Sequence, residues 1–79
     1  MNSDPNVAIV LAEGFEETEA VTVVDVLRRA GINVTVASLT DETAVKGSHD
    51  LLITADTPLS TLQEDQLDML ILPGGMPGA

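Results

Sequence analysis

Two short runs of apolar residues constrain the fold of this chain more than any other feature. Val7 to Ala12 contains no polar residue, and Met69 to Leu72 repeats the pattern later in the chain. A strand with one wet face alternates apolar and polar residues, whereas an unbroken apolar run is typical of a strand that is covered on both faces of a parallel sheet. We therefore predict an α/β fold built on a parallel sheet.

The segment after the first run predicts a helix and a returning strand. Glu16 to Ala30 has a helical pattern that ends at Gly31, and Arg28 and Arg29 lie in the last turn, where cations complement the helix dipole. Ile32 to Leu39 then alternates apolar and polar residues as a strand does. Strand, helix and strand together predict a right-handed βαβ unit.

The middle of the chain contains shorter elements. Ala44 to Thr54 reads as two short β pieces that are broken at Gly47 to His49. Thr57-Pro58 predicts a turn, Leu59 to Leu62 a short helix, and Gln63 to Asp68 an acidic linker before the second apolar run.

The balance of elements predicts an incomplete domain. A doubly wound sheet needs helices on both faces, but the pattern shows only one substantial helix for at least three strands. We therefore expect residues 1–79 to be the N-terminal part of a single domain, either as a fragment or as one of two chains. The C-terminal remainder of the same protein is then an expected partner.

Composition excludes several function classes. The net charge of −10, from 13 acidic and 3 basic residues, disfavours binding to nucleic acid and to anionic membranes. Phe15 is the only aromatic residue, so the chain offers no platform for stacking bases. No basic leader and no apolar run of about 20 residues is present, which favours a cytoplasmic location and no membrane span. There is no cysteine for a disulfide, a metal or a nucleophile.

Two glycine-containing segments follow the ends of predicted strands. Ligands of open α/β sheets bind at these carboxyl ends, so Glu13 to Glu16 and Pro73 to Gly75 are expected to line one edge. The first segment lacks the spacing of known phosphate-binding loops, and its glutamates would repel a phosphate. We expect neither a nucleotide cofactor nor a metal. Pro73 to Gly75 is either a simple turn or a pair of backbone donors at a site.

The helix places Glu19 among apolar residues. At about 100° per residue, Glu19 falls inside an apolar arc between Val26 and Ala30. A carboxyl in that position loses solvation, tends to keep its proton and can donate to an anion. Glu16 also points toward the arc and Glu17 lies at its edge, so the pattern does not single out Glu19. The alternative is that all three are solvated and complement the helix dipole, at about 0.3–1 kcal/mol each.

At this point the sequence resembles a known family. Val7 to Ala20, Asp25 to Ala37 and Leu72 to Ala79 are similar to ThiJ/PfpI (DJ-one) proteins, most closely to the DJ-one-like branch. The resemblance runs from Val7 to Ala79. It implies a flavodoxin-like (class I glutamine amidotransferase-like) parallel-sheet sandwich, incomplete in this chain, whose active-site cysteine lies at a strand-to-helix elbow beyond it.

The resemblance also implies roles for particular residues. Glu19 matches a protonated glutamate that hydrogen-bonds the cysteine sulfur, and Gly74 and Gly75 match glycines whose backbone N–H groups lie near that sulfur. A donated hydrogen bond stabilises a thiolate, and backbone donors hold an oxyanion or an oxidised sulfur.

Family members are usually dimeric, with the first helix near the two-fold axis. Thr18 and Thr22, on the polar stripe of that helix, are therefore candidate contacts to a second subunit. His49 stands where close relatives often have an arginine that reaches the neighbouring subunit's site. From the residues alone, a lone loop histidine is more often a surface residue than a ligand or base.

The resemblance leaves two functions open. The first is a cysteine-dependent hydrolase of the glyoxalase or deglycase type that acts on a small aldehyde, methylglyoxal, or on glycated adducts. The second is a redox-responsive stress-protective protein or chaperone that senses oxidation of the same cysteine. No residue supports the thiazole biosynthesis after which some relatives are named. Activity is expected of the complete protein and not of this chain alone.

Overall fold

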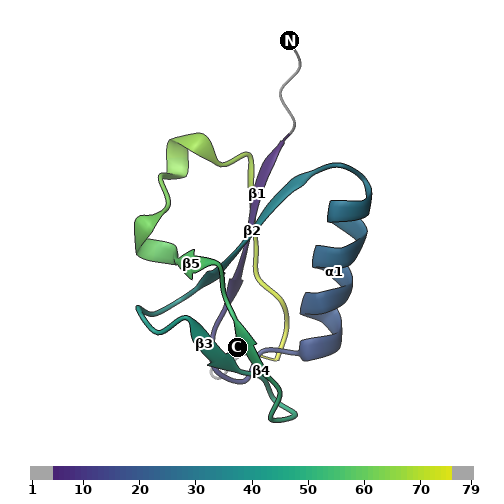
Figure 1. The fold of residues 1–79 in the computed structure, drawn as a ribbon, viewed down its shortest axis with the longest axis vertical. Helices are drawn as coiled ribbons and strands as arrows, with labels where there is room; N and C mark the ends of the chain where they lie inside the picture. The colour runs from purple at the N-terminus through teal and green to yellow at the C-terminus, as the bar shows by residue number, and fades with distance from the viewer. Residues whose placement is uncertain (1–4, 76–79) are drawn as a thin grey trace.

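The computed structural model describes residues 5–75, and Figure 1 shows their arrangement. Two terminal segments lie outside the described residues, Met1 to Asp4 and Met76 to Ala79. The second of them is part of the Leu72 to Ala79 segment on which the family resemblance rests. The elements are β1 (Asn6–Leu11), α1 (Glu17–Arg29), β2 (Asn33–Ser38), β3 (Ala44–Lys46), β4 (Leu52–Thr54), β5 (Thr57–Pro58), the 3-10 turns Leu59–Thr61 and Glu64–Gln66, and β6 (Met69–Ile71).

Four strands form one parallel sheet in the order β5-β2-β1-β6. Val7 of β1 lies opposite Val34 of β2 on one side and Met69 of β6 on the other, and all pairings are parallel. α1 connects β1 to β2 and packs alongside them (Figure 1). The predicted βαβ unit and the parallel α/β fold are confirmed.

α1 begins and ends close to the predicted positions. Glu16 caps its N-terminus, because the side chain accepts a hydrogen bond from the Thr18 N–H at 3.4 Å. The helix ends at Arg29 with Ala30 as its C-cap, and Gly31 follows with a φ of +83°, a conformation that glycine adopts without steric cost. Arg29 pairs with Asp25 one turn earlier, at 3.1 Å.

The core lies between α1 and β1. All residues of β1 from Val7 to Leu11 are buried, as the unbroken apolar run predicts for a central strand. Phe15, in the loop before α1, is fully buried. The core cluster consists of Ile9, Leu11, Phe15, Ala20, Val34 and Val45, with Val23, Val24, Leu27, Ile32, Val36, Ile53 and Ile71 packed around it.

Burial of the second apolar run was predicted wrongly. β6 forms at Met69–Ile71, but Met69 is 56% and Leu70 50% exposed, and Leu72 beyond it is 64% exposed. Among the described residues, β6 is the outermost strand next to β1, so its apolar side chains meet solvent. The unbroken apolar pattern indicates a strand with two covered faces, and residues 5–75 do not provide that cover.

The segment at Thr57-Pro58 was also predicted wrongly, as a turn. These residues form β5, which pairs with Ala37 and Ser38 at the end of β2. Proline lacks the N–H that an interior strand needs, and β5 satisfies this limit because it lies at the edge of the sheet. The short helix expected next is present as the 3-10 turn Leu59–Thr61.

The two short β pieces form a hairpin. β3 and β4 pair in antiparallel fashion, with Val45 opposite Ile53, and the chain reverses at residues 47–51. We call this reversal the 47–51 turn. Within residues 5–75, no helix is long and apolar enough to cross a membrane.

Candidate functional site

The two predicted segments meet at the carboxyl ends of β1 and β6. The Glu16 N–H donates to the Gly74 carbonyl at 2.9 Å, so the loop before α1 is bonded directly to the loop after β6. Gly75 has a φ of +82°, and a Cβ there would lie 3.1 Å from both the Glu16 nitrogen and the Gly14 oxygen. Glycine is therefore required at position 75 by both conformation and space.

Glu19 binds the same loop through its side chain. The Gly74 N–H donates to Glu19 Oε1 at 2.5 Å, across 55 residues of sequence. A Cβ at Gly74 would lie 3.3 Å from that oxygen, so the small residue permits the close approach. The structure thus brings Glu19, Gly74 and Gly75 to one edge of the sheet.

The predicted burial of Glu19 is wrong for the described residues. Glu19 is exposed, and so are Val26, at 55%, and Ala30, the two residues expected to flank it in the apolar arc. The inner face of α1 instead passes through Glu17, Ala20 and Leu27. Valines are spread around this helix, so the apolar pattern alone left its orientation ambiguous.

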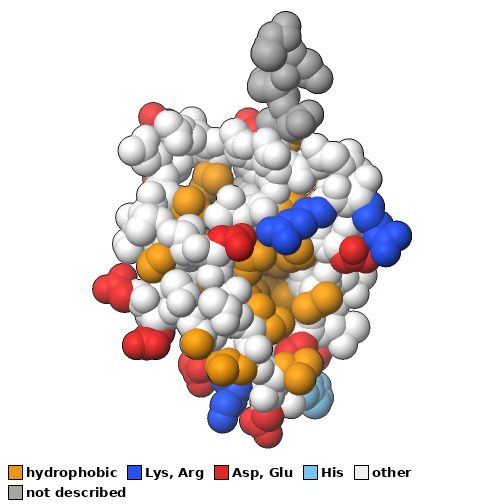
Figure 2. All heavy atoms as spheres, viewed as in Figure 1, with side chains coloured by type: hydrophobic (Ala, Val, Ile, Leu, Met, Phe, Trp, Pro, Cys, Tyr) orange, Lys and Arg blue, Asp and Glu red, His pale blue; other side chains and the backbone are white. Residues whose placement is uncertain are grey.

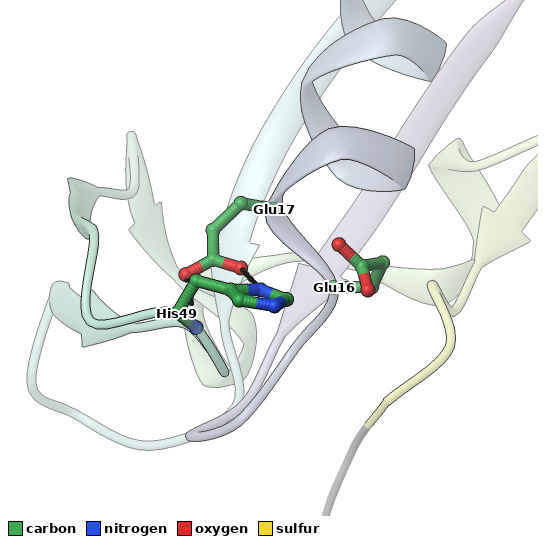
Figure 3. A group of neighbouring side chains, drawn as sticks. All are labelled: Glu16, Glu17 and His49. Carbon is green, nitrogen blue, oxygen red and sulfur yellow. Dashed lines mark hydrogen bonds and ion pairs between the residues drawn. The ribbon is translucent and has the colours of Figure 1, made fainter.

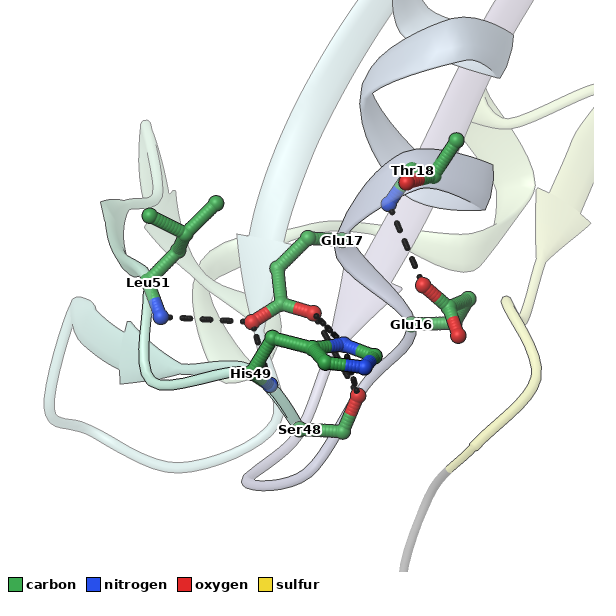
Figure 4. Close-up of polar contacts among 6 residues, drawn as sticks. All are labelled: Glu16, Glu17, Thr18, Ser48, His49 and Leu51. Carbon is green, nitrogen blue, oxygen red and sulfur yellow. Dashed lines mark hydrogen bonds and ion pairs between the residues drawn. The ribbon is translucent and has the colours of Figure 1, made fainter.

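Glu17 is the buried glutamate, and the sequence pattern placed it only at the edge of the arc. It is 4% exposed, and its carboxylate points at the 47–51 turn (Figure 4). Oε2 accepts hydrogen bonds from the His49 N–H at 2.7 Å and the Leu51 N–H at 3.2 Å. Oε1 lies 3.3 Å from Ser48 Oγ and 3.1 Å from His49 Nδ1. Its burial could have been inferred from the sequence, because Glu17 is three residues before Ala20 and so shares the inner face of the helix with it.

These contacts set the ionisation of both partners. Burial acts to raise the pKa of Glu17, but hydrogen bonds from its own N–H, from His49 and from Leu51 outweigh burial and lower the pKa from 4.5 to about 2. The hydrogen bond to Glu17 raises the pKa of His49 above its ordinary 6.5. The negative charges of Glu17, Glu16 and Asp50 act in the same direction, and partial burial opposes them.

Glu16, Glu17 and His49 also have the composition of a metal site. Each offers one ligand atom, and these atoms lie within 4.8 Å of one another (Figure 3). Both Glu17 oxygens already accept hydrogen bonds, from the 47–51 turn and from the His49 ring, so an ion would have to displace those donors. The N-terminus of a helix, next to which all three lie, also disfavours a cation. The donor set therefore suits a hydrogen-bonded carboxylate better than a metal.

The remaining candidate residues lie on the surface. Thr18 and Thr22 are exposed on α1, and the His49 side chain is 74% exposed.

An open groove of about 340 Å³ lies elsewhere, between α1 and the β3–β4 hairpin, and Val21, Val24 and Ile53 are among its lining residues. Figure 2 shows hydrophobic side chains gathered in the hollow at the centre of one face.

Comparison with known proteins gives consistent matches. The profile described as the DJ-1/PfpI family matches residues 5–79. Protein dj-1beta of Drosophila melanogaster is 49% identical over 71 residues, which are 90% of this chain and 38% of that protein. This chain therefore spans less than half the length of that relative.

Solved structures agree with the sequence matches. The crystal structure of Drosophila melanogaster DJ-1beta has a TM-score of 0.89 at 46% identity, covering 96% of this chain and 41% of that one. A structure described as oxidized Toxoplasma gondii DJ-1 has a TM-score of 0.87 at 40% identity, covering 92% and 40%. The flavodoxin-like fold class expected from the sequence is confirmed by these neighbours.

Proposed function

Because this chain belongs to the DJ-1/PfpI family, we propose that it is the N-terminal part of a cysteine-dependent hydrolase of the glyoxalase or deglycase type. The substrate is methylglyoxal or a glycated adduct. The nucleophilic cysteine comes from the C-terminal remainder, since these 79 residues contain none. The observation that carries the proposal is the hydrogen bond from Gly74 N–H to Glu19, which joins an acid to backbone donors at the ends of two strands.

Each group at this edge has a chemical use. The thiolate attacks the aldehyde carbon and forms a C–S bond, and the carbonyl electron pair moves to oxygen, which takes up a proton. In the complete site Glu19 supplies that proton and later accepts one through Oε2, since Oε1 is held by the Gly74 N–H. The Gly74 N–H is already donated to Glu19, so the backbone N–H of Gly75 is the proposed donor for the developing oxyanion.

A second function uses the same residues. One relative was solved in a form described as oxidized, which favours a redox-responsive protective protein or chaperone. In that case two equivalents of a peroxide oxidise the cysteine thiolate through the sulfenate to a sulfinate and are themselves reduced to water, and a protonated Glu19 donates a hydrogen bond to a sulfinate oxygen. The two functions differ in the fate of the cysteine: the enzyme regenerates its thiolate in every catalytic cycle, whereas the redox-responsive protein keeps it oxidised.

The experiment measures conversion of methylglyoxal to lactate by the full-length protein. Glu19→Gln keeps an oxygen that can accept from Gly74 N–H but cannot transfer a proton, so turnover is expected to fall by at least about 100-fold. Glu64→Gln removes an exposed charge in the Glu64–Gln66 turn and serves as the matched control. Equal turnover in wild type and Glu19→Gln would refute the enzyme. Holdase activity without turnover in wild type would favour the chaperone.

The assembly and location are part of the proposal. The groove between α1 and the hairpin is lined mainly by apolar residues, with Asp25, Arg28 and Asp56 among the others. Val21, which lines it, is 52% exposed, which suits contact with a second copy of the protein. In such a homodimer Thr18, Thr22 and His49 lie on or near the interface. We place the protein in the cytoplasm, with no nucleic-acid or membrane partner.

A further inference from the structure

The 47–51 turn is built around a negative charge. Asp50 has a φ of +68°, which is uncommon for a residue with a side chain, and it lies between the two N–H groups, of His49 and Leu51, that point at Glu17 Oε2. Successive backbone N–H groups in such a turn form a concavity that binds anions. Here the anion is the carboxylate of Glu17, which comes from the first turn of α1.

The Glu17 carboxylate occupies the space that a side chain at position 47 would need. Gly47 is buried, and a Cβ built on it would approach Glu17 Cδ to 2.3 Å. The turn is also bonded to the loop before α1, because Ser48 N–H donates to Phe15 O at 2.9 Å. The adjoining end of β3 is bonded to the same loop, because Gly14 N–H donates to Lys46 O at 2.8 Å. The turn and the N-terminus of α1 therefore form one hydrogen-bonded unit with Glu17 at its centre.

The contact with Glu17 bears on which nitrogen of His49 carries the proton. An ionised carboxylate only accepts hydrogen bonds, so His49 Nδ1, at 3.1 Å from Oε1, must be the donor. Ser48 Oγ lies 3.1 Å from the same nitrogen and 3.3 Å from Oε1, and can donate to the carboxylate as well. In neutral His49 the lone pair is then on Nε2, while the ring is 74% exposed.

We propose that Glu17 is a positioning residue that holds the 47–51 turn on the N-terminus of α1 and fixes His49 as its Nδ1–H form, with Nε2 presented to solvent beside Glu16. The charged groups that face the ring are Glu17 and Glu16 from the start of α1 and Asp50 from its own turn. All three are acidic, so protonation of Nε2 gives an imidazolium among carboxylates. His49 is thereby an oriented proton acceptor beside Glu16.

The test is ¹⁵N NMR of the His49 ring in the full-length protein across a pH titration. In wild type, the neutral ring is expected as the Nδ1–H tautomer, and the midpoint of its titration is expected above pH 6.5. Glu17→Gln is expected to lower the midpoint and to remove the preference for Nδ1–H, because the amide is neutral and can itself donate to Nδ1. Glu64→Gln, which removes the same charge at an exposed site, is expected to change neither.

The measurement on wild type keeps the proposal falsifiable if Glu17→Gln does not fold. A wild-type ring that is neutral as the Nε2–H tautomer, the common form in peptides, overturns the proposal without any variant. A folded Glu17→Gln protein with an unchanged tautomer and midpoint overturns it equally. None of these outcomes depends on turnover at Glu19, so failure here and failure of the proposed enzyme are distinguishable.

Discussion

The contact between Glu17 and His49 makes stability depend on pH in a defined window. The pKa of Glu17 is lowered from 4.5 to about 2, so its contribution is present above about pH 4.5 and is lost as the pH falls toward 2. The pKa of His49 is raised above 6.5, so its contribution is complete below pH 6.5 and is lost as the pH rises through the folded-state pKa. The pair therefore stabilises the fold most between pH 4.5 and 6.5.

This window is measurable as the urea midpoint of unfolding at a series of pH values. The difference in midpoint between wild type and Glu17→Gln is expected to be largest between pH 4.5 and 6.5 and to shrink on both sides. Glu64→Gln supplies the matched loss of one exposed charge. A difference that is constant from pH 2 to 9 would contradict the assigned contact.

The steric limit at Gly47 gives a second prediction for the same contact. Gly47→Ala places a Cβ against Glu17, with Cδ at 2.3 Å, and is expected to destabilise the protein by about 1–3 kcal/mol. Glu17→Ala removes the obstructing atoms, so the double variant should cost less than the sum of the two single variants. Additive losses in a urea double-mutant cycle would show that the two residues do not touch.

The connection between loops at the ends of β1 and β6 depends on Gly75. Gly75→Ala incurs both an unfavourable φ, +82°, and contacts at 3.1 Å, so we expect a loss of about 2–4 kcal/mol in chemical unfolding. Gly31→Ala is the matched control, because Gly31 has a φ of +83° with nothing within 4 Å of the added Cβ. It should lose only the backbone part, about 1–2 kcal/mol. Equal losses in the two variants would contradict the close approach of the loops.

The elements that the sequence predicted best are those with a local cause. The apolar run of β1 and the cap and glycine stop of α1 act within a few residues, and both elements begin and end within about one residue of their predicted bounds. β5 and the exposure of β6 were missed because they depend on which strand is a neighbour, and this information is not in the local pattern.

In the candidate site, too, the sequence predicted some features correctly and missed those that depend on a distant part of the chain. The rule that parallel strands present their carboxyl ends at one edge correctly brought the Glu13 to Glu16 segment to the Pro73 to Gly75 segment, where the Glu16 N–H donates to the Gly74 carbonyl. The burial of Glu17 depends on the 47–51 turn, more than 30 residues later, which supplies its donors. Periodicity within the helix carries no information about that distant turn, so it placed Glu17 only at the edge of the apolar arc.

The apolar groove gives a prediction about the assembly of the full-length protein. Val21→Glu puts a charge on the rim of the groove and is expected to weaken the homodimer at least tenfold, since burial of an unpaired carboxylate costs more than about 1.4 kcal/mol. Ser60→Glu adds the same charge at an exposed position in the Leu59–Thr61 turn and should leave dimerisation unchanged. Sedimentation equilibrium measures both. A wild-type protein that is monomeric at micromolar concentration would contradict the proposed dimer.

The central claim is that Glu19 and the Gly74–Gly75 loop form one half of a cysteine site in the full-length protein. If so, the proton on Glu19 and the backbone donors stabilise a thiolate, and the cysteine pKa lies below the ordinary value of about 8.5. Glu19→Leu removes the donor and should raise that pKa toward about 8.5. Glu19→Gln keeps an acceptor for Gly74 N–H and should fall between the two.

The most direct measurement is therefore the pH dependence of cysteine alkylation in the full-length protein, compared among wild type, Glu19→Leu, Glu19→Gln and the control Glu64→Gln. We predict a depressed cysteine pKa in wild type and Glu64→Gln, and a clear rise in Glu19→Leu. A wild-type pKa near about 8.5, or one that Glu19→Leu leaves unchanged, would contradict the claim that this edge of the sheet activates a cysteine.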